Sequence, residues 1–258
     1  MHLAGGTHMY ALELLDRTGL AFTSRWLHII AGVAWIGLLY YFNLVQVPSF
    51  AAMSANARTE SIDILARKAL WWFRWAAVAT VVTGLAITGF AKDYYDNFGK
   101  SPNGISISTG MLIALIMFVN VWGVIWQKQK IVLASAVQVR AGGEALPEAA
   151  AAGRAAGMAS RQNVLLSFTM IWFMTFTSHF SFAFDTASSS GSRITYWILT
   201  LVILAVLELN CLGIIGGGFK PAAESPFNWP YESVRNVLIS GFVLWGVFWL
   251  MWEIIFAP

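Results

Sequence analysis

The sequence has very little charge. Only 11% of its 258 residues are Asp, Glu, Lys or Arg, whereas 58% are hydrophobic and 15% are aromatic. A soluble domain carries about 25% charged residues, so this composition cannot cover a water-exposed surface. The shortage of charge excludes an ordinary soluble domain and a disordered chain, and it indicates an integral membrane protein.

Cysteine is almost absent as well. Cys211 is the only cysteine, which excludes an intramolecular disulfide and a Cys-x-x-Cys-His motif for covalent haem attachment. The formal net charge is only +3, and no basic run with interleaved aromatic residues occurs. We therefore expect no nucleic-acid partner, because nucleic-acid binding needs a concentrated basic surface.

Long stretches without charge are abundant instead. A helix needs about 20 residues to cross the hydrocarbon core of a bilayer. The stretches predict six transmembrane helices, at about 20–47, 70–91, 106–128, 162–184, 194–215 and 235–256. The longest connection is 129–161, with a short surface helix expected within 141–159. Since no linker or internal repeat divides the chain, we expect one all-α transmembrane domain over 1–258, a bundle in contact with membrane lipid.

The basic residues are distributed unequally between the two sides of this predicted membrane domain. Eleven of the sixteen Lys and Arg residues lie on the side of the 129–161 connection, and five lie on the side of the two termini. Short loops rich in Lys and Arg stay in the cytoplasm. We therefore expect a protein of the bacterial cytoplasmic (inner) membrane with both termini in the periplasm.

Two histidines lie inside the predicted spans. At a rise of 1.5 Å per residue, His28 is about 12 Å below the start of the first helix, and His179 is about 8 Å from the end of the fourth. Both of these helix ends are on the predicted periplasmic side, so the two imidazoles lie at a similar depth. Two neutral imidazoles on facing helices ligate a b-type haem. His28 and His179 are therefore predicted to bind the iron of haem b.

The surroundings of His28 fit this interpretation. Gly32 lies one turn further along the helix, where a small residue lets a flat macrocycle approach, and Arg25 is placed to meet a propionate. A non-haem metal fits less well, because no Asp, Glu or Cys lies at that depth on either helix. Two alternatives remain open: the histidines form interhelical hydrogen bonds, or they handle protons or a substrate.

A second set of polar residues is predicted in the cytoplasmic half of the bundle. It includes Glu208, Asn120 and Asn43. Glu208 would serve in proton uptake or in a quinone site. The structural alternative is that its carboxyl is protonated or hydrogen-bonded to Asn120 or Asn43.

Four segments, in matching order, resemble the N-terminal membrane domain of the bacterial membrane-bound urate hydroxylases, or urate oxidases. They are Arg25–Gly37, Trp72–Trp75, Ile116–Lys130 and Asn163–Phe180. The resemblance implies a membrane scaffold for redox work, with His28, His179, Asn120 and Asn163 in matching positions. That family carries a C-terminal cytochrome c domain, and we expect this chain to be a shortened version without one.

Three functions are compatible with these observations. The leading hypothesis is a membrane electron-transfer subunit whose haem b exchanges electrons with a periplasmic cytochrome c or a larger respiratory complex. The resemblance alone implies the second, a membrane oxidoreductase acting on urate or another small substrate, although Trp71 and Arg161–Gln162 stand where that family has further histidines. The third is a non-catalytic anchor or assembly subunit of a redox complex. The sequence leaves open whether the chain is an enzyme.

Overall fold

The computed structural model describes residues 13–90, 99–184 and 189–256, and these residues form helices without a strand. The α-helices are α1 (Arg17–Tyr40), α2 (Val47–Ala52), α3 (Ala55–Ser61), α4 (Arg67–Phe90), α6 (Pro102–Val119), α7 (Trp126–Arg140), α8 (Ala149–His179), α9 (Ser190–Cys211) and α10 (Val234–Phe256). Short 3-10 turns are present at η1 (Glu13–Leu15), η5 (Ser181–Ala183) and η6 (Pro226–Tyr231). The prediction of an all-α membrane protein is confirmed.

Three π-helical segments join α-helices end to end. They are η2 (Tyr41–Gln46) between α1 and α2, η3 (Ile62–Ala66) between α3 and α4, and η4 (Asn120–Ile125) between α6 and α7. A π-helical turn is rare, widens the helix by one residue and often marks a functional site. The second and third predicted spans therefore extend as continuous helices, 55–90 and 102–140, well beyond the charge-free stretches.

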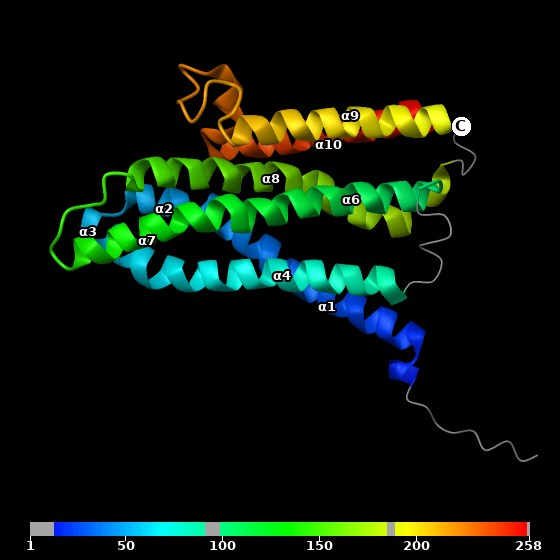
Figure 1. Cartoon of the computed structure of the whole chain (residues 1–258), viewed down its shortest axis with the longest axis horizontal. Helices are drawn as coiled ribbons and strands as arrows, with labels where there is room; N and C mark the ends of the chain where they lie inside the picture. Colours follow the sequence, from blue (N-terminus) through cyan, green and yellow to red (C-terminus); the bar gives the residue numbers. More distant parts are fainter. Residues whose placement is uncertain (1–12, 91–98, 185–188, 257–258) are drawn as a thin grey trace, which may run out of the picture.

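The helices run along one common axis and alternate in direction (Figure 1). We call the end where α1 begins and α10 ends the terminal end, and the end where residues 141–148 join α7 to α8 the loop end. At the loop end, Asp63 of η3 forms an ion pair with Arg67 at 2.6 Å and another with Arg140 of α7. The pair with Arg140 ties the extension of α4 to that of α7.

The connection predicted at 129–161 is much shorter in the structure. Helix α7 continues to Arg140 and α8 already begins at Ala149, so only 141–148 form a loop. The expected surface helix is the first part of α8 rather than a separate element. The sequence explains the difference, because the segment from Ala149 is rich in alanine, the strongest helix former.

The central helix of the bundle is α8, which packs against α6, α7 and α10 and also touches α1 and α9. Five helical segments of the described chain are long and apolar enough to cross a membrane, namely 17–52, 55–90, 102–140, 190–211 and 234–256. Helix α8 is the sixth long helix. It carries buried polar residues such as Gln162 and Asn163, because neighbouring helices rather than lipid surround it.

An aromatic cluster holds α9 and α10 to α8 near the terminal end. Trp252 of α10 is completely buried, and its ring centroid lies 5.0 Å from Phe176, 5.4 Å from Tyr196 and 4.8 Å from Phe256. The hydroxyl groups of Tyr196 and Thr109 lie 2.9 Å apart, which links α9 to α6. Van der Waals packing of these rings stabilises the contact between the helices, because the hydrophobic effect does not drive helix association in lipid.

Candidate functional site

Both predicted haem ligands line one pocket near the terminal end. The pocket has a volume of about 360 Å³ and lies between α1, α4, α6 and α8. We call it the histidine pocket, and its walls include Arg25, His28, Trp35, Gly84, Thr175 and His179. Its volume falls within the range of about 300–1,000 Å³ that is typical of small-molecule and cofactor sites.

His28 is held by α4. Its Nδ1 lies 2.8 Å from the carbonyl oxygen of Thr80 and 3.3 Å from the hydroxyl of Thr83. Because a carbonyl oxygen only accepts, Nδ1 carries the proton and donates it to Thr80. The neutral ring then keeps a lone pair on Nε2, which is the tautomer that a metal-ligating histidine needs.

His179 has the same kind of anchor within its own helix. Its Nδ1 lies 3.0 Å from the carbonyl oxygen of Thr175, one turn earlier in α8. Since the carbonyl oxygen only accepts, Nδ1 donates to it, which leaves Nε2 as the other ring nitrogen, as in His28. Within the described part of the chain, three or more His, Cys, Asp or Glu side chains nowhere gather into a metal site. His28 and His179 are the two candidate metal ligands of the histidine pocket.

Gly84 of α4 makes room for the His28 ring. A Cβ atom at this position would lie 3.1 Å from Cε1 and 3.3 Å from Nδ1 of His28, closer than ordinary van der Waals contact. The residue predicted for close approach was Gly32, which does not line the pocket and has no neighbour within 4 Å of a Cβ built on it. A glycine inside a helix destabilises the helix by about 1 kcal/mol relative to alanine. A glycine at position 84 of an apolar stretch could therefore have been predicted to have a packing role.

Two further α1 residues belong to the wall of this pocket. Arg25 lines it as predicted and is exposed to the surroundings. Trp35 lines it too and is completely buried, and its indole Nε1 has no hydrogen-bond partner among the residues described. An unpaired buried donor costs about 1–3 kcal/mol, and an acceptor on a bound molecule would remove that cost.

Asn120 and Glu208, predicted as a polar set in the other half of the bundle, are in contact. Asn120 of η4 donates through Nδ2 to Oε2 of Glu208 at 3.1 Å and to Oδ1 of Asn163, also at 3.1 Å. Asn163 in turn donates to the carbonyl oxygen of Met117 at 2.9 Å. The structure therefore joins α6, α8 and α9 through a buried amide pair and a half-buried carboxyl.

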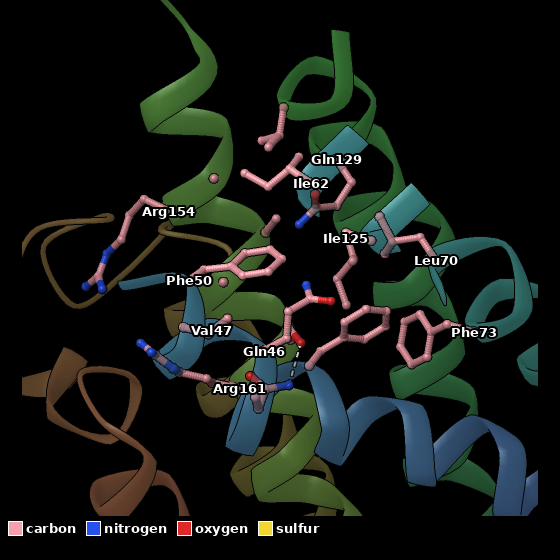
Figure 2. A pocket seen from close by; sticks show the side chains of 18 residues that line it. Gln46, Val47, Phe50, Ile62, Leu70, Phe73, Ile125, Gln129, Arg154 and Arg161 are labelled. Carbon is pink, nitrogen blue, oxygen red and sulfur yellow. Dashed lines mark hydrogen bonds between the residues drawn. The ribbon is translucent and has the colours of Figure 1, made fainter. Parts of the chain in front are cut away.

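Asn43 does not bond to this network. It donates through Nδ2 to the carbonyl oxygen of Leu39 at 2.9 Å and to the hydroxyl of Ser160 at 2.8 Å. Asn43 lines a second pocket of about 260 Å³, nearer the loop end, between η2, η3, α4, α7 and α8 (Figure 2). We call it the glutamine pocket, and it is defined by Phe42, Asn43, Gln46, Phe50, Phe73 and Gln129. Among these residues, Asn43 alone was predicted as a site residue from the sequence.

Comparison with known proteins identified no relative, so the function is inferred from the geometry of these sites. Models of protein families, curated proteins and solved structures all gave no match to this chain. The geometry offers two histidines with Nδ1 bonded to backbone carbonyls at the terminal end, and a mostly apolar pocket with amide side chains towards the loop end. The first of these arrangements suits a flat metal-containing cofactor.

Proposed function

We propose that the protein is a membrane electron-transfer subunit that holds haem b in the histidine pocket, with His28 and His179 as its axial ligands. One observation carries the proposal: both imidazoles line the same pocket, and backbone carbonyls hold both Nδ1 atoms. Each ring thereby keeps Nε2 for the iron. Haem b supplies one-electron redox chemistry when it is bound.

Other residues of the pocket fit this cofactor. Arg25 offers a guanidinium group to a propionate, which is a strong charge-assisted pair. The indole Nε1 of Trp35 is a buried donor in need of an acceptor. Gly84 keeps the His28 ring close to α4 and so fixes its plane. The remaining walls are mostly apolar, which excludes water and tunes the reduction potential.

We further propose that the terminal end faces the periplasm of a bacterium with an inner membrane. Basic residues favour this orientation, because eleven of them lie towards the loop end and five towards the terminal end. One of the five, Lys92, lies outside the described residues. The haem would then exchange electrons with a periplasmic cytochrome c or with a larger respiratory complex.

The spectrum of the purified full-length protein tests the proposed function. A reduced-minus-oxidised difference spectrum with a b-type band, at about one haem per chain, is the expected result. The protein should be expressed with an ample haem supply, so that low loading does not hide the site. A haem-supplied preparation without a b-type band would overturn the proposal.

Replacing Gly84 with Ala is expected to weaken haem binding about 10-fold. The new Cβ would crowd Cε1 and Nδ1 of His28 and disturb the bond from Nδ1 to Thr80. Changes to the groups that orient a metal ligand cost about 10–100-fold in affinity. Haem titration of the apoprotein measures the effect. Gly89→Ala is the matched control on the same helix, because a Cβ there meets nothing within 4 Å. Equal affinity in both variants would contradict the role of Gly84.

Reporter fusions are expected to place the loop end in the cytoplasm. Alkaline phosphatase fused after Pro258 should be active, because this enzyme matures only in the periplasm. The same reporter inserted at Gly142, within the short loop between α7 and α8, should be inactive. The reverse pattern would invert the orientation and place the histidine pocket on the cytoplasmic side.

A further inference from the structure

We infer that the glutamine pocket binds the headgroup of a lipid-soluble quinone or quinol. This second site lies at a different level of the bundle from the histidine pocket, goes beyond the proposed haem site and does not depend on it. The inference rests on the shape of the pocket, an unpaired buried amide oxygen, two arginines whose guanidinium groups point away from it (Figure 2), and its level along the helices.

The pocket has the size and walls for one aromatic-sized ring. Its volume of about 260 Å³ lies just below the range of about 300–1,000 Å³ typical of pockets for drug-sized ligands. Phe42, Phe50 and Phe73 contribute to its walls, and the rings of Phe42 and Phe73 meet edge to face with centroids 5.4 Å apart. Such walls favour a flat ring, because aromatic faces and edges attract one another.

Gln46 supplies the polar contact. Its side chain is only 8% exposed, and its Oε1 has no hydrogen-bond partner in the part of the chain that is described. Figure 2 shows Gln46 pointing into the pocket, with Gln129 pointing into it from the other side. A carboxamide donates through its nitrogen and accepts through its oxygen. Gln46 can therefore donate to a quinone carbonyl and accept from a quinol hydroxyl.

The two arginines of this pocket do not make it a site for an anion. Arg154 forms an ion pair with Glu232 at 2.7 Å, and Arg161 donates to the carbonyl oxygen of Tyr231. Figure 2 shows both guanidinium groups pointing away from the pocket. Their aliphatic stems contribute to the wall while their charges are used elsewhere. The ligand that fits is consequently uncharged.

The level of the pocket suits a headgroup with an apolar tail. The predicted spans end near 47, 70, 128 and 162, and the pocket is lined from these same levels by Val47, Leu70, Gln129 and Arg161. Charged residues lie within two residues of the last three of these levels. The pocket therefore lies at the boundary between hydrocarbon and water, where a ring can be hydrated or bonded while its tail stays in lipid.

All three π-helical segments converge on this pocket. Gln46 comes from η2, Ala66 from η3 and Ile125 from η4. A π-helical turn is rare and is frequently found at functional sites. Three of them around one small pocket are a second sign that the pocket has a ligand.

Direct binding of decylubiquinone tests the inference. The full-length protein in phosphatidylcholine nanodiscs would be titrated with the radiolabelled quinone, and the signal of protein-free nanodiscs would be subtracted. Saturable binding to one site per chain is expected. Gln46→Leu is expected to bind about tenfold more weakly, the size of one lost hydrogen bond. Gln127→Leu is the matched control, because Gln127 is exposed on the same helix as Gln129 and does not line the pocket.

The outcomes separate this inference from its alternatives. Gln46→Leu removes an unpaired buried acceptor, so its thermal stability should equal or exceed that of the wild type and weaker binding cannot reflect unfolding. Absence of saturable binding, or unchanged binding in Gln46→Leu, would overturn the inference. Equal displacement by decylbenzene, which lacks the carbonyl groups, would identify a lipid-chain site and overturn it too. Binding by His28→Ala should be normal, so failure of the haem proposal and failure of this one give different results.

Discussion

Replacing His28 with Ala is expected to abolish the b-type spectrum, and replacing His179 with Ala is expected to do the same. In the proposed site each imidazole supplies one axial ligand from a different helix of the pocket, so each change would leave the iron with a single axial ligand and an open side. The measurement is the reduced-minus-oxidised difference spectrum of each purified variant at equal protein concentration.

Thr175→Ala is the control for this experiment. It keeps the carbonyl oxygen that anchors Nδ1 of His179 and removes only a hydroxyl that donates back to Ile171. The b-type spectrum should therefore persist in this variant. Its persistence would show that a small change at this end of α8 does not by itself remove the haem. If His28→Ala and His179→Ala both keep a normal b-type spectrum, the shared-ligand proposal is wrong.

Replacing Trp252 with Ala is expected to cause the largest loss of stability of any single change in the aromatic cluster. The side chain is completely buried and contacts rings from α8 and α9 as well as its own helix. Truncating a buried aromatic residue in a soluble protein costs about 3–5 kcal/mol. We expect about 3 kcal/mol here, because lipid solvates the unfolded helices and only the packing and cavity contributions remain.

Trp249→Ala is the matched control on the same helix. Trp249 is 41% exposed and its indole donates to Glu253 on the next turn. Its replacement should change the free energy of unfolding by no more than about 0.5 kcal/mol, as surface substitutions do. Unfolding in mixed detergent micelles, followed by circular dichroism, measures both variants. Similar losses in the two would show that the cluster does not stabilise the bundle.

The apolar helices could be predicted from the sequence, because lipid excludes charged residues. The extensions of these helices beyond the apolar stretches could not. Nothing in the charge pattern distinguishes a loop from a helix that continues into water, and the segments around Asp63 and Arg140 are helical and paired with each other. Hydropathy is also a weak guide to α8. Its Gln162 and Asn163 are buried by other helices, so the helix needs less apolar surface than its neighbours.

Only part of the candidate site could be predicted, because a sequence shows depth along a helix but not the neighbours of that helix. Depth along a helix can be counted from the sequence, so His28 and His179 were singled out together. Residue spacing does not show which helices pack against one another. The contact of His28 with Thr80 and Gly84 depends on the pairing of α1 with α4. The bond of Asn43 to Ser160 rather than to Glu208 depends on the place of α8 in the bundle.

At the loop end the helices continue beyond the apolar stretches that can cross a bilayer. The helix from α6 through η4 to α7 has 39 residues, about 58 Å at 1.5 Å per residue, while the hydrocarbon core is about 30 Å thick. The ion pairs of Asp63 with Arg67 and Arg140 place the excess length at the loop end. The helices at the loop end therefore continue well past the length that a bilayer needs. A partner protein can contact this additional length of helix from the side.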